Sequence, residues 1–229
     1  MTSLVKSVIM FGAASFALSG CLGSSGSGGG ATATAPAPGS LLGDRTAPDL
    51  AAASTLAAAA LAEDDEFDGP DAPRIMALLS DVVDANSAAT PEASALTGTA
   101  SYAGDFAAGE IDDGDLGLLG DFALSVNFDA ATLSGNLGGE IIVDGEGPRR
   151  VATGSANITG TVDGTGMSAT VTGVYVDGGE AAGIDGVMSG RFAGTDAGMV
   201  AGGMALAVGG DGDAPTFFEG VFAGERSAP

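Results

Sequence analysis

The only cysteine of the chain, Cys21, is the residue whose type most directly suggests chemistry. A lone cysteine can be a nucleophile, a metal ligand, half of an intermolecular disulfide or a point of covalent attachment. The chain has no second cysteine for an internal disulfide, and no histidine that would activate a thiol or complete a zinc site. The residues around Cys21 therefore have to decide its role.

The absence of histidine also removes most enzymatic chemistry. A Ser-His-Asp triad and an imidazole general base are both impossible in this sequence. Catalysis by two converging carboxylates would remain, but the candidate pair Glu140 and Asp144 falls on the polar, outward positions of its expected strand. We therefore expect no enzymatic activity, no catalytic residues and no cofactor.

Two further groups of residues could bind a ligand. Acidic clusters at 110–117 and 209–215 have the carboxylates that calcium prefers, but they lack EF-hand spacing, and Asp-Gly pairs are typical of hairpin turns. Tyr102 and Tyr175 could each ligate haem iron. Both tyrosines occupy inward positions of the strand pattern, so we expect them to be core or rim residues and predict no metal site.

An export signal precedes Cys21. Met1–Gly20 contains the charged Lys6 and then the apolar run VIMFGAASFAL, which is too short to span a bilayer as a folded helix. The residues LSGC, at 18–21, closely resemble the lipobox of bacterial lipoproteins. That resemblance implies that the chain is cut before Cys21, that the cysteine is the lipid attachment residue, and that the protein contacts the membrane through this anchor. A simple secretory signal followed by a free thiol is the alternative.

The residues after Cys21 bear on location. Leu22 stands where an aspartate retains enterobacterial lipoproteins on the inner membrane, so the resemblance implies the outer membrane, with exposure at the cell surface as a further option. Residues 21–47 combine Gly and Ser with Ala-Pro pairs and have no hydrophobic period, which predicts a flexible tether. About 25 such residues have a mean reach of roughly 25–30 Å, enough to lift a domain clear of lipid headgroups.

The charge balance excludes two classes of partner. The chain carries 30 acidic and 7 basic residues, and its formal net charge is −23. A surface of that sign repels nucleic acid and bare anionic lipid, so we expect neither to bind the folded protein directly. The acidity otherwise favours solubility.

Residues 48–92 are expected to be partly helical. In the stretch PDLAAASTLAAAALAEDDE, Pro48 can occupy the first helical position and the alanines favour a helix, although the acids at its end oppose the helix dipole. In PRIMALLSDVVDAN, which has a proline at its start and Asn86 near its end, the apolar residues recur at helical spacing. They form one stripe: Ile75, Leu78, Leu79, Val82 and Val83. We expect this stripe to cover the body of the protein; a detached amphipathic segment that binds a partner is the alternative.

From Ala95 onward the hydrophobic period changes from helical to two. Apolar or glycine positions alternate with polar positions in about eight runs, and turn residues separate the runs. One run, from 153 to 161, has a fully polar face of Thr, Ser and Asn. The runs expected to be strands are 96–102, 122–128, 133–143, 152–162, 167–176, 184–192, 200–208 and 216–224.

About eight strands with one buried face predict an all-β, antiparallel up-and-down barrel, because closure removes exposed sheet edges. Inward glycines beside inward phenylalanines suit a small, filled barrel. The outward Asp, Ser, Thr and Asn argue against a barrel embedded in lipid. A two-sheet sandwich is the structural alternative. The expected organisation is a signal peptide at 1–20, a flexible tether at 21–47, a helical, partly disordered segment at 48–92 and the barrel at 93–229.

The stretch SGRFAGTDAGMVAGGMAL, at 189–206, resembles the barrel of transferrin-binding protein B and related surface lipoproteins that include factor H binding protein. The residues shared with this pattern are Gly190, Phe192, Gly194, Ala197, Val200 and Gly202. The final run EGVFAGER is similar to the closing element of the same family at Gly220, Val221, Phe222, Gly224 and Arg226. Ala193, Thr195, Met199 and Met204 depart from the pattern. The resemblance implies a filled eight-stranded barrel held out from the outer membrane, with loops that bind a protein partner.

Together these features predict a lipid-anchored outer-membrane or surface lipoprotein whose barrel binds a macromolecular partner through its loops. The alternative is a lipocalin-like carrier of a small apolar ligand or haem, which would need an open cavity inside the barrel. The sequence predicts one functional residue by number, the lipid attachment residue Cys21.

Overall fold

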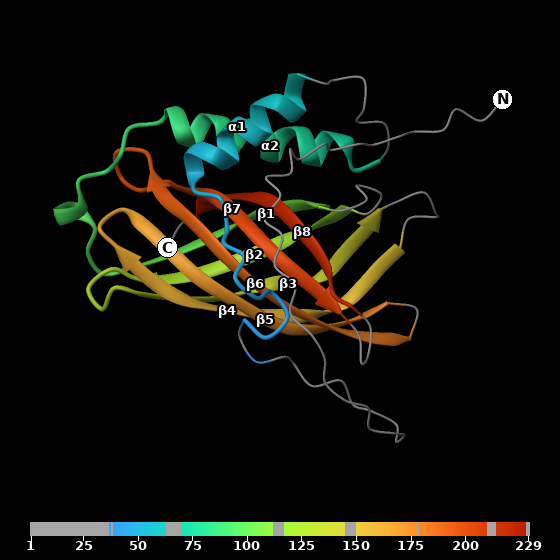
Figure 1. Cartoon of the computed structure of the whole chain (residues 1–229). Coiled ribbons are helices and arrows are strands. Elements are labelled where there is room, and N and C mark those ends of the chain that lie inside the picture. The colour runs from blue at the N-terminus through green and yellow to red at the C-terminus, as the bar shows by residue number, and fades with distance from the viewer. Residues whose placement is uncertain are drawn as a thin grey trace.

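Two helices precede a barrel of eight strands (Figure 1). The structure, a computed structural model, describes residue 37 and residues 39–62, 70–111, 117–144, 150–177, 179–209 and 214–227, without the side chains of residues 139–150. The helices are α1 (Leu50–Ala62) and α2 (Ala72–Ser87). The strands are β1 (Thr99–Glu110), β2 (Gly117–Asn127), β3 (Thr132–Asp144), β4 (Arg150–Asp163), β5 (Gly166–Asp177), β6 (Glu180–Ala193), β7 (Met199–Gly209) and β8 (Thr216–Arg226).

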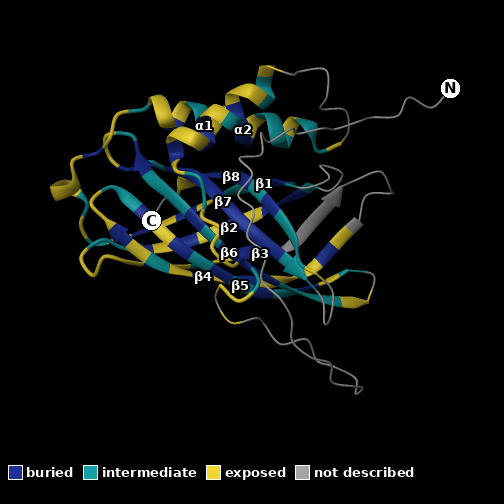
Figure 2. Ribbon diagram, viewed as in Figure 1, coloured by how far each residue is buried: buried dark blue, intermediate teal, exposed yellow. Residues whose placement is uncertain are grey.

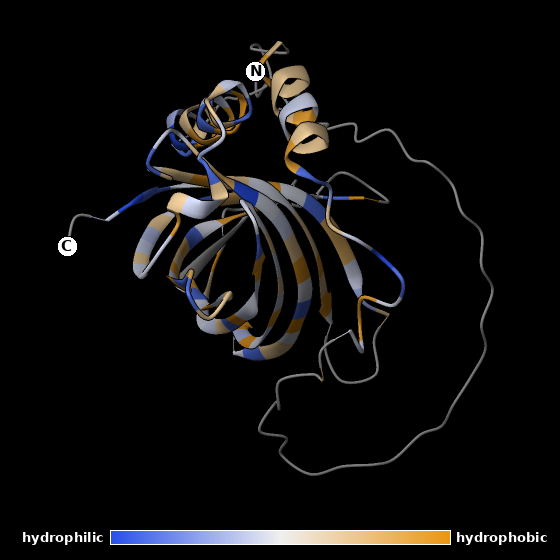
Figure 3. Ribbon diagram, turned by 90° about the vertical axis from the view of Figure 1, so that its left-hand side faces the viewer, coloured by the Kyte–Doolittle hydropathy of each residue, from blue (hydrophilic) through white to orange (hydrophobic). Residues whose placement is uncertain are grey.

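The sheet closes on itself. Each strand pairs antiparallel with the next in the chain, and β1 pairs with β8, where Phe106 lies opposite Phe222. Figure 3 looks toward the end of this barrel, with both helices outside its wall. The predicted up-and-down barrel is thereby confirmed and the two-sheet sandwich is wrong. The first strand begins at Thr99 rather than at residue 96, because the backbone of Gly98 turns into the left-handed region at φ +71°.

Large side chains fill the barrel from inside. Phe106, Phe192 and Phe222 are 0 % exposed, and Phe122 is 2 % exposed. The rings of Phe122 and Phe222 pack edge to face with centroids 5.6 Å apart. Between them the interior is lined by aliphatic residues and by Met188 and Met204, all of which belong to one buried cluster.

Glycines make room for these rings, as the sequence predicted. A Cβ atom on Gly224 would lie 2.7 Å from Cζ of Phe122, and a Cβ on Gly190 would lie 2.9 Å from Cζ of Phe222. Gly202 is equally constrained, since its Cβ would lie 2.0 Å from the carbonyl oxygen of Ser189. Close packing therefore explains three glycines of the family-like motifs, Gly190, Gly202 and Gly224, whereas Gly194 lies in a turn at φ +83°.

The two helices cover one side of the barrel. In α2 the apolar stripe faces the wall, with Leu78, Leu79 and Val82 at 2 %, 6 % and 0 % exposure. These residues pack with α1 on small outward side chains of β6, β7 and β8: Ala193, Ala201, Val221 and Ala223. The prediction that the stripe covers the body is confirmed, and Figure 2 shows that β7 is buried along most of its length.

Asp49, the residue after Pro48, fixes the start of α1. Asp49 accepts a hydrogen bond from the amide of Ala52 at 2.9 Å, which is a helix N-cap, so Pro48 lies before the helix and not inside its first turn. The two helices contact each other as well as the wall. Neither α1 nor α2, the helices of the described part of the chain, is long and apolar enough to cross a membrane.

Candidate binding surface

The opposite side of the barrel exposes three rows of uncharged polar side chains. Strand register aligns Thr132, Thr161 and Ser168 in one row across β3, β4 and β5. The other two rows are Ser134, Thr159 and Thr170, and Asn136, Asn157 and Thr172. We call these nine residues the hydroxyl face. The polar outward face predicted for β4 is thus confirmed and extends over its two neighbours.

Neighbouring strands are tied together by the hydroxyl groups of this face. The Oγ1 atoms of Thr159 and Thr170 lie 3.2 Å apart, and Oγ1 of Thr161 lies 3.4 Å from Oγ of Ser168. Thr170 also donates to the carbonyl oxygen of Thr159 at 3.3 Å. Short side chains that already form hydrogen bonds with one another lose little conformational entropy when a partner covers them. The entropic cost of burying this face is therefore small.

The hydroxyl face is also unusual in charge. The chain has 30 acidic residues, yet no member of the face is acidic or basic. The nearest outward acids are at the borders of the face: Asp163, at the end of β4, and Asp185 of β6, which lies opposite Thr172 but is 0 % exposed. A partner can therefore reach the face without placing its charges directly against a carboxylate.

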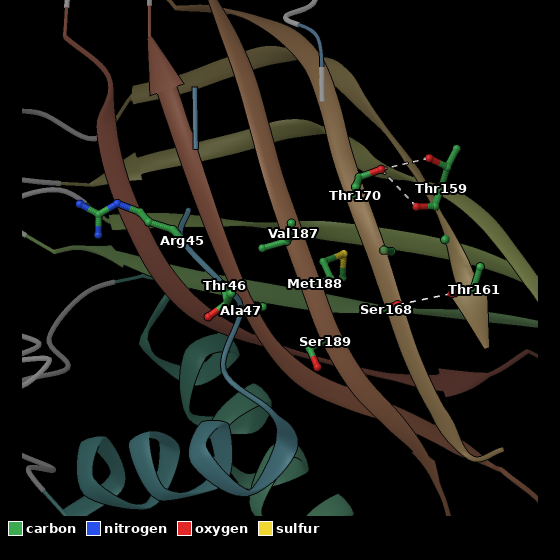
Figure 4. Close-up of a pocket in the computed structure, with 12 residues that line it drawn as sticks. Arg45, Thr46, Ala47, Thr159, Thr161, Ser168, Thr170, Val187, Met188 and Ser189 are labelled. Carbon is green, nitrogen blue, oxygen red and sulfur yellow. Dashed lines mark hydrogen bonds between the residues drawn. The ribbon is translucent and has the colours of Figure 1, made fainter. Parts of the chain in front are cut away.

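A groove of about 500 Å³ overlaps the hydroxyl face, since Thr159, Thr161, Ser168 and Thr170 are among the residues that line it (Figure 4). Its floor is formed by β4, β5 and β6, and includes Thr159, Thr170 and Ser189. Arg45, Thr46 and Ala47, which precede α1, line its other side. The volume is in the range of sites that hold small molecules or short chain segments.

Residues 39–48, here called the strap, cross the outside of β6, β7 and β8 before α1 begins. The carboxylate of Asp185 on β6 accepts hydrogen bonds from the amides of Gly39, Leu41 and Leu42. Part of the expected tether at 21–47 therefore lies against the barrel, because this buried acid satisfies backbone groups of the strap.

The arginines whose side chains are described all bind within the fold. Arg74 of α2 donates from Nε to Asp105 at 3.0 Å and also pairs with Asp121. Arg191 donates to the carbonyl oxygens of Ala85 and Asn86 at the end of α2. The two others are Arg226, which donates to the carbonyl oxygen of Asp196, and Arg45, which lies 3.9 Å above the ring centre of Phe217.

The tyrosines considered as haem ligands are core residues. Tyr102 is 1 % exposed and its hydroxyl donates to the carbonyl oxygen of Ala197 at 2.8 Å. Tyr175 donates to the carbonyl oxygen of Gly138 at 3.0 Å. Burial raises the pKa of Tyr102 to about 12 and raises that of Tyr175 above its usual range. Both hydroxyls thus stay protonated and bonded at neutral pH.

Other predicted features fall outside the described residues. These are the signal segment and Cys21, most of the tether, and the centres of both acidic clusters, at 112–116 and 210–213. Within the described part of the chain, no three Asp, Glu or Cys side chains gather in a group that could hold a metal ion. The loops expected to bind a partner remain a prediction for the same reason, because several lie in the segments that are not described.

Sequence reasoning missed Asp185 and the strap that it holds. A signal was present: the outward residues of β7 are small and, like its inward residues, carry no polar side chain; they are Ala201, Gly203, Ala205 and Ala207. A strand that is apolar on both faces is covered on both faces. The same pattern would have indicated that an acid on the adjacent strand, Asp185, is buried under that cover.

No protein-family model matches this chain, and no curated protein matches it in sequence. Among solved structures, transferrin-binding protein B from Haemophilus parasuis Hp5 aligns with 61 % of this chain at 19 % identity and a TM-score of 0.36. The isotype 1 transferrin-binding protein B from serogroup B Neisseria meningitidis aligns with 60 % of this chain at 19 % identity and a TM-score of 0.35. The aligned parts are 29 % and 28 % of those two chains, so this chain spans under a third of their length. The family resemblance of the sequence motifs stays a prediction.

Proposed function

We propose that this protein is a lipid-anchored outer-membrane or surface protein whose barrel binds a macromolecular partner on its outside. The lipobox-like LSGC segment supports the anchor at Cys21. The partner would contact the hydroxyl face, the groove that overlaps it and the loops that border them. Transferrin-binding proteins, by their name, bind transferrin.

The observation that carries this proposal is the contrast between the inside and the outside of the barrel. Inside, rings and aliphatic side chains occupy the space, with Phe106, Leu137 and Phe222 all at 0 % exposure. Outside, two helices and the strap cover one side, whereas the hydroxyl face is left bare. A ligand therefore finds an accessible surface on the exterior wall rather than in the packed core.

The carrier alternative is less well supported. A carrier needs an apolar cavity of several hundred Å³ inside the barrel. The side chains that would line it touch each other instead, as the edge-to-face pair of Phe122 and Phe222 illustrates. The hydroxyl groups of Tyr102 and Tyr175 are bonded to backbone carbonyls, which opposes haem ligation by either residue.

The anchor is tested by Cys21→Ser. We expect the wild-type protein to incorporate labelled acyl chains and to sediment with membranes, because two or more buried acyl chains hold a soluble domain on a bilayer. Cys21→Ser should abolish the label and shift the protein to the soluble fraction. Membrane association of an unacylated wild-type protein would contradict the proposed anchor.

The binding surface is tested by Thr159→Lys, which puts a long charged side chain at the centre of the hydroxyl face. Partner proteins captured from the native cell surroundings by the wild-type protein should bind this variant at least about ten-fold more weakly, a loss typical of a central interface residue. Ala58→Lys adds the same charge to an exposed position of α1 and should change affinity less than about two-fold. Equal binding by both variants would remove the hydroxyl face from the proposal.

A further inference from the structure

The strap is held mainly by one carboxylate. Asp185 is 0 % exposed and lies on the outward side of β6, between Thr172 of β5 and Ala207 of β7. It accepts from the amides of Gly39 and Leu41 at 2.9 Å each and of Leu42 at 3.3 Å. Hydrogen bonds from backbone amides to an ionised acid are stronger than those between neutral groups.

Side-chain contacts complete the hold on the strap. Leu42 is 3 % exposed and packs with Ala205 and Ala207 of β7. The guanidinium group of Arg45 covers the ring of Phe217 on β8. Burial raises the pKa of the neighbouring Glu219, and the positive charge of Arg45 opposes that rise. Further along, the strap passes so close to β7 that a Cβ on Gly203 would lie 2.4 Å from Cγ of Pro48.

The strap nevertheless differs from the rest of the fold in how it is held. Its residues belong to no helix or strand, so no ladder of backbone hydrogen bonds joins them to the barrel. Apart from Ser54, Asp185 is the only polar or charged residue buried in the described part of the chain, and all its hydrogen bonds in this part come from the strap. If the strap leaves, Asp185 becomes hydrated, and the closed barrel keeps every one of its strand pairs.

We propose that the strap is a releasable latch, held by Asp185, that sets the length of the tether between the barrel and Cys21. Release of the strap does not depend on the proposed lipid anchor; only its effect on the distance between the barrel and a membrane rests on that anchor. While the strap is held, residues 22–38 separate the lipid attachment residue from the barrel and can span at most roughly 60 Å. Release of the strap, residues 39–48, extends that maximum by about 30 Å, because α1 then becomes the first attached element.

The latch also bears on the groove. Arg45, Thr46 and Ala47 form one of its sides, so the groove is complete only while the strap is held. A ligand that binds in the groove therefore raises the equilibrium constant between the held and the released strap, which favours the short tether. By linkage, release of the strap lowers the affinity for that ligand by the same factor. In this way the reach of the tether and the occupancy of the groove depend on each other.

Amide hydrogen exchange of the full chain carrying Cys21→Ser tests the latch without any lipid, so failure of the anchor and failure of the latch are distinguishable. We expect Asp185→Ala to speed exchange of the Leu41 and Leu42 amides at least about ten-fold, because their acceptor is gone. Exchange within β7 should change less than about two-fold. Asp163→Ala, which removes an exposed acid from β4, is the matched control and should leave the strap unchanged.

A second variant acts from the strap side. Leu42→Ser removes the apolar contact with β7 and should also speed exchange in the strap alone, which decides the question if Asp185→Ala does not fold. Two results would overturn the latch: exchange of the strap at the wild-type rate in the variants, or a rise in exchange that spreads equally over β6, β7 and β8. The second result would mean that the strap and the wall open as a single unit.

Discussion

Val82→Asp is expected to lower the free energy of unfolding by about 3–5 kcal/mol, the range for a buried charge without a partner. Val82 is 0 % exposed between α2 and the barrel wall, in the cluster that includes Ala201 and Val221. A new carboxylate there could not reach water without moving the helix off the wall. Urea unfolding followed by circular dichroism measures the loss.

Ala77→Asp is the matched control on the same helix. Ala77 is exposed and one turn after Arg74, so the added charge should cost less than about 0.5 kcal/mol. An equal stability of Val82→Asp and the wild-type protein would mean that α2 does not depend on the wall. The apolar stripe would then be available to a partner, which was the alternative for this helix.

Phe222→Ala is expected to cost about 3–5 kcal/mol, the usual loss when a large ring is removed from a packed core. The Phe222 ring is 0 % exposed, packs against Phe122, and occupies the space left by Gly190. Its removal leaves a cavity that the closed barrel cannot collapse easily, because hydrogen bonds on both sides fix each strand. Thermal or denaturant unfolding would measure the change.

Phe222→Leu retains most of the volume and should cost about 1–2 kcal/mol, which separates the effect of size from that of aromatic contact. The cavity in Phe222→Ala should also bind a small aromatic molecule such as benzene, as engineered apolar cavities do. A loss below about 1 kcal/mol in Phe222→Ala would show that the ring is not tightly surrounded. That outcome would revive the carrier alternative, because it requires open space inside the barrel.

Most of the barrel could be predicted from the sequence because its pattern is local. In a strand with one buried face, polarity alternates with a period of two, and the run from Thr153 to Thr161 follows this alternation almost without exception. The stripe on α2 is equally local, since its residues lie within four turns of helix. Closure followed from the number of strands and from the cost of an exposed edge.

The cover over β6–β8 could not be predicted in the same way, because it depends on contacts between residues far apart in the chain. Asp185 and Leu41 are 144 positions apart, and although 39–48 differs from the Gly-rich tract before it by two leucines, one acid and one arginine, these residues show no period that indicates a contact. Its two leucines can be recognised as contact residues only when the small outward residues of β7 against which they pack are known. Alternation also suggested a polar exterior throughout, which is correct for the hydroxyl face and wrong for β7.

The contacts of the arginine side chains determine which charges the surface presents to an approaching molecule. Arg74, Arg191 and Arg226 are bound to groups of the fold, so their charges are neutralised or turned toward the protein at short range. With a formal net charge of −23, the field within about a Debye length of the surface, roughly 8 Å at physiological ionic strength, is that of a polyanion. Under the proposed function, a cationic partner would associate at a rate that falls as salt is added, whereas its residence time would depend on salt-insensitive contacts with the neutral hydroxyl face. Capture and retention would then fall to different parts of one surface.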